Sequence, residues 1–329
     1  MAKRKNKKVN PSLPRWVVSV FVAIALVLSV LTFGGDLAGM DTSFLQSCMD
    51  AIDRLLYGGP TSPAPSLPAS GQAKVYIIDV GQGESILITT EERSMLIDAG
   101  ENDKGDEVLA FLDTLGLDSL DYALATHPDS DHIGGLDTVL ESIEVGEVFF
   151  GEIPAKLTPT TKTYEDVLDV IEEKDIPLSL AHAGDIIDMG SGAQLTILGP
   201  IDPQQATSKN NASLVSRLDF GETSFLFNGD QEAPMEKMLL ENGVDLDCDM
   251  MTMGHHGSST STKKKFLEAV TPAMAVIECG DNSYNHPNAN TVKRLENYTD
   301  KIYRTDLLGT IVMVSDGRDI QVHWEREAA

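Results

Sequence analysis

The sequence is most informative at residues 126–135, which read THPDSDHIGG. Four potential metal ligands, His127, Asp129, Asp131 and His132, fall within six residues directly after an apolar run that we predict as a strand. A tight loop at a strand end can direct these side chains to two sides, which suits two cations a few ångströms apart. The glycine pair that follows lets the backbone approach closely and opens a helix. A solvated acidic loop with chance histidines is the alternative, and the density of the pattern argues against it.

Further ligand-type residues follow other apolar runs downstream. Asp230 ends the sequence FNGD, His255 and His256 lie in MGHHGS, and His286 precedes a proline. Each comes after a segment that we predict as a strand, so they can converge at one edge of a sheet. The sequence therefore predicts one metal centre that is assembled from several loops.

Strand and helix signals alternate from about Lys74 to Arg326. Strands are predicted at residues 75–80, 85–89, 95–97, 122–126, 194–198, 214–218, 224–227, 249–253, 273–277, 302–303, 310–314 and 320–324. Helices are predicted at residues 107–115, 232–241, 263–270 and 289–297. Two strand-rich halves with outer helices indicate an α/β fold, a four-layer αββα sandwich of two sheets between helical layers.

Charge is divided unequally along the 329 residues. The whole chain has 25 Lys and Arg against 51 Asp and Glu, a formal net charge of −26 at pH 7. Residues 1–15 hold six of the basic residues and no acidic one, so the rest of the chain has a balance of −32. That balance disfavours a protein that coats DNA through a broad basic face, but it is compatible with an enzyme that has a small local site. The three cysteines, Cys48, Cys248 and Cys279, exclude a disulfide scaffold and lack the CxxC spacing of structural zinc sites.

The N-terminal region predicts a membrane anchor. Residues 1–15 form a basic cytoplasmic tip, and residues 16–35 are uncharged and long enough to span about 30 Å of hydrocarbon as a helix. Basic residues before this transmembrane helix place the N-terminus inside and the bulk of the chain outside. Residues 36–57 have the spacing of a juxtamembrane helix, residues 58–73 are a linker rich in Pro, Ser and Gly, and residues 74–329 form the main domain. The alternative is a cleaved signal peptide and secretion, although no clean cleavage site follows.

Together these motifs resemble the metallo-β-lactamase superfamily, in which a histidine and aspartate loop of the form HxHxDH binds a dinuclear metal centre. Within it the chain is most similar to the extracytoplasmic hydrolase domain of ComEC-type DNA-uptake (competence) proteins. The resemblance covers nearly all of residues 74–326 and depends on these segments, which appear in the family order: DVGQGES at 79–85, THPDSDHIGG at 126–135, NNASLV at 210–215, NGD at 228–230, GHHGS at 254–258, HP at 286–287 and YRTD at 303–306. The multi-pass channel portion of that family is absent, so we expect a stand-alone hydrolase domain on a single anchor.

The resemblance implies roles for individual residues. His127, Asp129, Asp131 and His132 match the first metal loop, with Asp129 in the place of its second histidine. Asp131 also counts among the catalytic residues. Asp230 matches the aspartate that bridges the two metals.

The downstream histidines have two implied roles. His286 best matches the last metal-binding histidine of the family. His255 or His256 matches a site histidine that binds metal or acts as a general acid, and the resemblance does not say which of the two does so.

The third histidine of the usual family pattern has no clear counterpart. His182 is the only histidine between the first metal loop and Asp230, and its neighbours place it in a hairpin, which favours a surface histidine. The family position is matched instead by Asn210-Asn211 with Ser213, whose oxygens can take that place. Because oxygen ligands replace nitrogen, the centre favours Mn²⁺ or Mg²⁺ over a pure zinc site, and Zn²⁺ stays open.

Two divalent ions at such a centre would share a water or hydroxide, lower its pKa and neutralise charge in the transition state. A histidine of the His255-His256 pair is placed to protonate the leaving oxygen. Asp79 and Asp98 each end a strand and are candidates for orienting the metal-bound histidines. For Asp79 the alternative is capping of the Gly81-Gln82-Gly83 turn.

The substrate is predicted from residues 258–265. Hydroxyl residues from Ser258 lead into Lys263, Lys264 and Lys265 at a helix start, which makes a local anion site, and a solvated helix face is the alternative. A phosphodiester, and DNA in particular, is the natural anionic substrate, so we predict a membrane-anchored nuclease or phosphodiesterase whose DNA-uptake channel is a separate protein. Hydrolysis of a lactone, thioester or other small molecule is the second hypothesis, and a non-catalytic binding module is the third.

Overall fold

The structure, a computed structural model, describes residues 69–326. The predicted cytoplasmic tip, transmembrane helix and juxtamembrane segment lie outside the described residues, as does most of the predicted linker. Within residues 69–326 no helix is both long enough and apolar enough to span a bilayer. The first described strand begins at Ala73.

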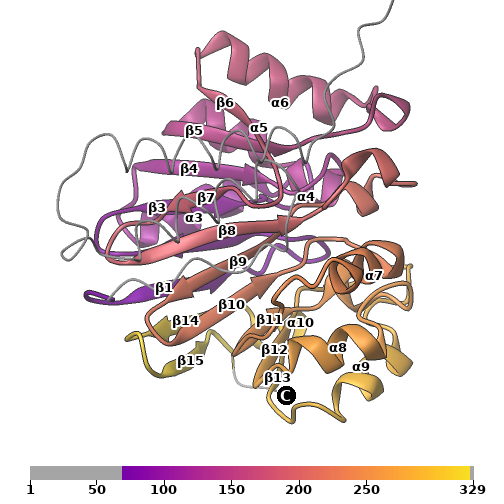
Figure 1. Cartoon of the computed structure of the whole chain (residues 1–329). Helices are drawn as coiled ribbons and strands as arrows, with labels where there is room; N and C mark the ends of the chain where they lie inside the picture. The colour runs from indigo at the N-terminus through magenta and orange to yellow at the C-terminus, as the bar shows by residue number, and fades with distance from the viewer. Residues whose placement is uncertain (1–68, 327–329) are drawn as a thin grey trace, which may run out of the picture. The chain divides into compact units, whose positions relative to one another are not determined.

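The first sheet has eight strands, and it is antiparallel in one part and parallel in the other (Figure 1). In order across the sheet they are β15 (Ile320–Trp324), β14 (Ile311–Ser315), β1 (Ala73–Ile77), β2 (Ile86–Thr89), β3 (Ser94–Ile97), β4 (Ser119–Ala125), β5 (Glu144–Gly151) and β6 (Leu178–Ala181). Neighbours from β15 to β3 are antiparallel, whereas β3, β4, β5 and β6 run parallel.

The second sheet has seven strands and repeats this pattern. In order they are β7 (Ile186–Asp188), β8 (Ala193–Gly199), β9 (Val215–Phe220), β10 (Thr223–Phe227), β11 (Met250–Thr252), β12 (Met274–Ile277) and β13 (Ile302–Arg304). Strands β7 to β10 are antiparallel neighbours, and β10, β11, β12 and β13 run parallel.

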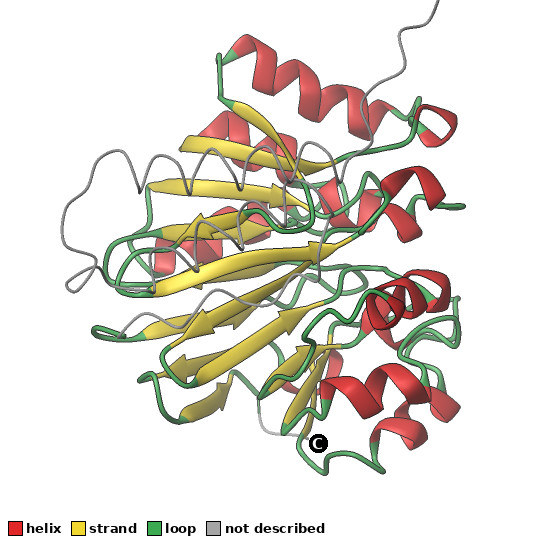
Figure 2. Cartoon of the chain, in the orientation of Figure 1, coloured by secondary structure: helices red, strands yellow, loops and turns green. Residues whose placement is uncertain are grey.

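Helices cover the outer faces of both sheets (Figure 2). Three of them, α3 (Gly105–Thr114), α5 (Leu136–Ser142) and α6 (Lys162–Glu173), share one apolar cluster with the first sheet. Three others, α7 (Ala233–Glu241), α8 (Lys264–Val270) and α9 (Ala289–Leu295), share another with the second sheet. Short helical turns α4 (Ser130–Ile133), α10 (Thr305–Leu308), η2 (Ala155–Leu157), η3 (Pro203–Gln205), η4 (Asn210–Ala212) and η5 (Gly254–Gly257) lie in the connections.

Alternation along the strands explains the layers. In β1, Val75 and Ile77 lie in the apolar cluster between the sheets, whereas Tyr76 lies in the cluster beneath the helices. Successive strand side chains point to opposite faces, so a strand covered on both faces must be apolar throughout. This pattern is visible in the sequence, and the predicted αββα sandwich is confirmed.

The region from β5 to β7 differs from the sequence prediction. Over residues 144–188, where the sequence pattern predicts only a hairpin around His182, the structure has β5, α6, β6 and β7. The strands β6 and β7 are the edges of their sheets, and Leu178, Leu180 and Ile186 on them are exposed. An edge strand is only partly covered, so its sequence carries a weaker burial pattern than a central strand.

The parallel strands determine where the polar loops meet. The chain leaves β4 into Thr126 and His127, leaves β10 into residues 228–230, and leaves β11 into residues 253–256. The carboxyl ends of parallel strands lie at the same edge of a sheet, where ligand-bearing loops collect. A backbone hydrogen bond of 3.0 Å from Leu214 N to the Thr126 carbonyl joins the loops of the two sheets at this edge.

Candidate metal centre

The loop before β2 holds the first histidine–aspartate loop in place. Glu84 N donates to the Asp131 carbonyl oxygen at 3.0 Å. Gly83 has a φ of +149°, and a Cβ at that position would lie 2.4 Å from the same oxygen. The second glycine of DVGQGES is therefore required by close backbone approach to the metal loop.

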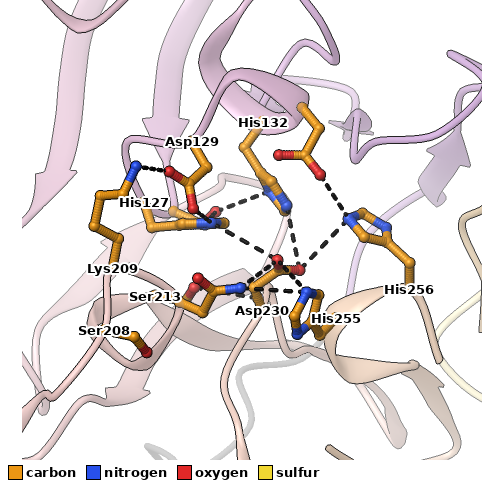
Figure 3. Close-up of polar contacts among 12 residues, drawn as sticks. His127, Asp129, His132, Ser208, Lys209, Ser213, Asp230, His255 and His256 are labelled. Carbon is orange, nitrogen blue, oxygen red and sulfur yellow. Dashed lines mark hydrogen bonds and ion pairs between the residues drawn. The ribbon is translucent and has the colours of Figure 1, made fainter. Parts of the chain in front are cut away.

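The Asp230 carboxylate lies at the centre of the site, between four histidines (Figure 3). Its Oδ1 atom is 3.2 Å from His132 Nε2 and 3.5 Å from His256 Nε2. Its Oδ2 atom is 3.5 Å from His255 Nε2 and 3.8 Å from His127 Nε2. The two oxygens of one carboxylate thus face two different groups of side chains.

On the Oδ1 side, four ligand atoms form a compact group that could hold a metal ion. We call Asp131, His132, Asp230 and His256 the four-ligand cluster, because one ligand atom of each lies within 4.8 Å of the others. His256 Nε2 is 3.4 Å from Asp131 Oδ2.

Three buried atoms of this cluster, His132 Nε2, His256 Nε2 and Asp230 Oδ1, have no hydrogen-bond partner of good geometry. A buried polar atom without a partner costs about 1–3 kcal/mol, so three that converge on one point fit a divalent cation.

The histidines of the cluster are held through their second ring nitrogens. His132 Nδ1 lies 2.6 Å from Asp98 Oδ2, and His256 Nδ1 lies 2.9 Å from the Glu278 carbonyl oxygen. Because these acceptors fix the proton on Nδ1, the Nε2 lone pairs are directed into the cluster. Asp98 also accepts a 2.8 Å hydrogen bond from Thr126 N, which ties it to the end of β4.

The adjacent His255 and His256 have a strained backbone that makes their side chains diverge. Both residues have a φ of 52°, in the left-handed region. Non-glycine residues held there cost about 1–3 kcal/mol each. The two rings are 6.2 Å apart and inclined by 71°, so one faces each side of Asp230.

On the Oδ2 side, hydrogen-bond donors are mixed with the ligand-type groups. Asp129 Oδ2 lies 3.5 Å from His127 Nε2, while its Oδ1 forms an ion pair with the Lys209 ammonium. Asn210 Nδ2 donates to Asp230 Oδ2 at 3.1 Å and lies 3.3 Å from His255 Nε2. His127 is fully buried here and Asp129 is 25% exposed, as Asp131 is on the other side, so the one difference in burial is His255, which is 21% exposed.

Neighbouring charges shift the pKa values of the residues in the four-ligand cluster. Burial raises the pKa of Asp131, but His256 and His132 outweigh it and hold that pKa well below its usual range. Burial lowers the pKa of His132 and of His256, but neighbouring carboxylates, chiefly Asp230, raise both above the ordinary value. In the absence of metal, protons on the histidines therefore compensate the carboxylate charge that a cation would otherwise compensate.

Two buried glutamates lie behind the cluster and were not identified from the sequence. Burial raises the pKa of Glu278 to about 8 and that of Glu84 well above its usual range. Burial thus favours the neutral form of both carboxyl groups. A glutamate inside an otherwise apolar segment, as Glu278 directly after β12, is the signal that could have found them.

The structure gives the contacts of three predicted residues, His286, Asn211 and Asn210, which the sequence could not specify. His286 is next to His255, with ring centroids 5.0 Å apart, and is not part of the four-ligand cluster, where His256 provides the histidine. Asn211 is buried, and its amide nitrogen bonds to Ser208 Oγ and Glu232 Oε2, both at 2.8 Å. Its neighbour Asn210 faces Asp230 instead.

Three other predicted residues, Ser213, Asp79 and His182, are not members of the four-ligand cluster. Ser213 Oγ accepts a 3.2 Å hydrogen bond from Asp230 N. Asp79 accepts from Gly81 N at 3.2 Å and pairs with Arg326, so it caps the turn that was the alternative prediction. The His182 side chain is 52% exposed, which agrees with a surface histidine.

The three lysines of the predicted anion site, but not Ser258, lie together at a second location. A cavity of 590 Å³ between α7, α8 and α9 has five basic and two acidic residues in its lining, and these are Lys237, Lys263, Lys264, Lys265, Arg294, Glu236 and Glu241. No member of the four-ligand cluster lines it. Ser258 is buried, and its Oγ lies 2.9 Å from Thr260 Oγ1, so its hydroxyl is bound within the loop.

Comparison with known proteins identifies relatives of the described region. The profile of the metallo-β-lactamase superfamily matches residues 78–278. "ComE operon protein 3" of Bacillus subtilis is 31% identical over an alignment of 261 residues, and the match covers 74% of this chain and 33% of that protein. "Competence protein ComA" of Neisseria gonorrhoeae is 30% identical over 260 residues, which are 78% of this chain and 34% of that protein. The chain thus spans about a third of the length of these curated relatives.

A solved structure shares the fold. The chain superposes on CmlA, a diiron β-hydroxylase from Streptomyces venezuelae, with a TM-score of 0.50 and 12% sequence identity. The match covers 79% of this chain and 55% of CmlA. At that identity the similarity describes the arrangement of strands and helices and says nothing about the reaction.

Proposed function

Because this chain belongs to the metallo-β-lactamase superfamily, we propose that it is a metal-dependent phosphodiesterase, a nuclease that acts on DNA outside the cell membrane. The proposal depends above all on one observation, the convergence of Asp131, His132, Asp230 and His256 with unpartnered buried atoms. A curated relative that is named a competence protein, together with the resemblance to DNA-uptake proteins, supports a DNA substrate.

We assign the four-ligand cluster to one divalent ion, and His127, Asp129 and Asp230 Oδ2 to a second. Asp230 would then bridge the two ions. Mn²⁺ or Zn²⁺ is the expected metal and Mg²⁺ the alternative, because the donor set combines three histidine nitrogens with carboxylate oxygens. When bound, the ions supply an acidified water and positive charge for the transition state.

His255 is the proposed proton donor to the leaving oxygen. It is more exposed than His256, with 21% of its side chain accessible against 2%. Its Nδ1 lies 3.8 Å from Glu232 Oε1, a carboxylate that can stabilise the protonated ring. His256 is instead buried and fixed by the Glu278 carbonyl, which suits a ligand.

Substrate charge is matched by the basic cavity between α7 and α8. Lys263, Lys264 and Lys265 line it together with Arg294. The rest of the chain after residue 15 is strongly acidic, so this cavity offers a local site for phosphate groups rather than a broad binding face. We propose that the strand being cut contacts these residues on its way to the metal centre.

Residues 16–35 are proposed as the membrane anchor, with the hydrolase domain on the extracytoplasmic side and a cleaved signal peptide as the alternative. A separate channel protein would then take up the processed DNA. Fractionation of cells into membrane and soluble parts, with and without residues 1–35, tests the anchor independently of the reaction.

Cleavage assays on the purified full-length chain test the reaction. The chain is stripped of metal, reloaded with Mn²⁺, Zn²⁺ or Mg²⁺, and given single-stranded DNA, duplex DNA, RNA, a chromogenic phosphodiester and a lactone panel. Metal-dependent DNA cleavage that is lost in Asp131→Ala and kept in His182→Ala is the expected result. Hydrolysis of lactones without cleavage of any nucleic acid would overturn the proposal in favour of a small-molecule hydrolase.

A further inference from the structure

We propose that Lys209 competes with the second divalent ion for Asp129, so that the two ions bind with widely separated affinities. This inference rests on the proposed two-ion centre and adds a residue that controls its occupancy. The two sides of Asp230 are unequal in geometry, in charge and in the kind of atoms they present.

Geometry favours the first ion. The four-ligand cluster has four ligand atoms within 4.8 Å of one another. Over residues 69–326 one other group meets that spacing, Glu84, Asp98 and His132, and it lies on the same side of the centre. His127, Asp129 and His255 approach Asp230 or each other at 3.5–3.8 Å but form no such group.

The Lys209 and Asn210 atoms that face Asp129 and Asp230 Oδ2 are hydrogen-bond donors and not metal ligands. The stretch Lys209-Asn210 presents an ammonium to Asp129 and an amide NH₂ to Asp230 Oδ2. An ammonium has no lone pair and cannot ligate a cation, and an amide that donates through its nitrogen does not do so either. Lys209 holds Oδ1 of Asp129, whereas Oδ2 lies 3.5 Å from His127 Nε2, so a metal ion at Oδ2 would share this carboxylate with the ammonium.

Charge adds to this competition. Lys209 and Asp129 are partly buried, with 33% and 25% of their side chains exposed, so water screens the pair only in part. The ammonium therefore already neutralises the charge that would attract the second ion, and it repels that ion until it is displaced.

The expected consequence is sequential binding. We expect the first Mn²⁺ to bind at the four-ligand cluster and the second to bind at least about tenfold more weakly. Lys209 can swing out, because its four-carbon stem is flexible and its side chain, in the loop before η4, is one third exposed. Occupancy of the second position would then follow the local concentration of metal.

Isothermal titration with Mn²⁺ alone tests this on the metal-stripped full-length chain. In the natural chain we expect two binding events at least about tenfold apart. Lys209→Met keeps the aliphatic stem and removes the charge, so the second event should tighten about tenfold while the first is unchanged. Lys209→Arg keeps the charge and should behave like the natural chain. Electron paramagnetic resonance should show isolated Mn²⁺ at one equivalent and a coupled pair at two.

Several outcomes would overturn the inference. Equal affinities in the natural chain would do so, as would a second event that Lys209→Met leaves unchanged or that is absent from every variant. Thermal unfolding of each variant shows whether it has folded, and Lys209→Ala replaces any that has not. The titration contains no DNA, so a chain that binds Mn²⁺ as described but cuts no nucleic acid disproves the proposed function alone.

Discussion

The two sides of the Asp230 carboxylate differ in how firmly their histidines are held and in what pairs with their aspartates. Next to Oδ1, His132 and His256 are almost completely buried and each is anchored through Nδ1. Next to Oδ2, His127 is buried too, but His255 is partly exposed, and Asp129, which is no more exposed than Asp131, pairs with Lys209. A preorganised side binds an ion without reorganisation, whereas the open side is adjustable and accessible to substrate. In the proposed two-ion centre, the Asp230 carboxylate would therefore join a preorganised metal position to an adjustable one.

Removal of Asp131 should have the largest effect. Asp131→Ala takes one of the four ligands from the cluster and leaves His256 Nε2 without its 3.4 Å partner. We expect metal affinity and cleavage to fall by at least about 100-fold, beyond the 10–100-fold typical of an outer-shell partner. Asp129→Ala should weaken only the second ion. The comparison of the two sides fails if metal analysis and rates show an equal or larger loss for Asp129→Ala.

Asp98 tests how much the anchoring of His132 contributes. Asp98→Asn weakens the 2.6 Å contact with His132 Nδ1, so the ring loses its fixed tautomer. We expect a loss of about 10–100-fold in affinity for the first ion, measured by titration with Mn²⁺.

Asp79→Asn is the matched control, because Asp79 also follows a strand but contacts a turn and Arg326. Its first-ion affinity should equal that of the natural chain. A similar loss in both variants would mean that the effect is general destabilisation rather than orientation of His132.

The pH dependence of metal binding should test the Oδ1 side of the centre. The pKa values of His132 and His256 are raised above the ordinary 6.5, so these rings hold protons at a higher pH than a free histidine. A metal ion needs the neutral rings, and its binding therefore releases protons. Affinity for the first ion should begin to fall at a pH above 6.5 as the pH is lowered.

Titration of Mn²⁺ between pH 6 and pH 8.5, in buffers of different ionisation enthalpy, measures both the affinity and the protons released. Affinity that stays constant down to pH 6, with no proton release, would contradict the assignment of these histidines as ligands.

The smallest effect is expected at the basic cavity, which lies apart from both sides of the centre. Lys264→Ala with Lys265→Ala should raise the half-saturating DNA concentration by about two- to fivefold, because each exposed lysine contributes little. The effect should shrink as salt is raised, and Mn²⁺ affinity should be unchanged. A change in metal affinity would show that the cavity and the centre are not independent.

The layered fold could be predicted because the sequence of each central strand shows that both of its faces are buried. Strands such as β1, β10 and β12 are apolar on both faces, and that pattern requires cover on both sides. The edge strands β6 and β7 leave alternate residues exposed, so their sequences resemble a surface hairpin. Prediction failed where burial was incomplete.

The candidate site also has residues that the sequence could predict and residues that it could not. The dense motif at residues 127–132 specified its own ligand types, and Asp230 and the His255-His256 pair followed strands that could be recognised. The assignment of His256 rather than His286 to the four-ligand cluster depends on a left-handed backbone at two successive residues, which no local pattern indicates. The role of His286 stays a prediction.

The sequence by itself determined the kind of chemistry, since histidines and carboxylates placed after apolar strands bring metal-ligand atoms to one sheet edge. Only the tertiary structure decided how those atoms are divided. Lys209 and Asn210 reach the centre from a loop about 80 residues away from Asp129 in the chain, and such contacts depend on the packing of two sheets rather than on local sequence. Distances of a few ångströms between distant segments decide which carboxylate oxygen is free for a cation and which is already paired.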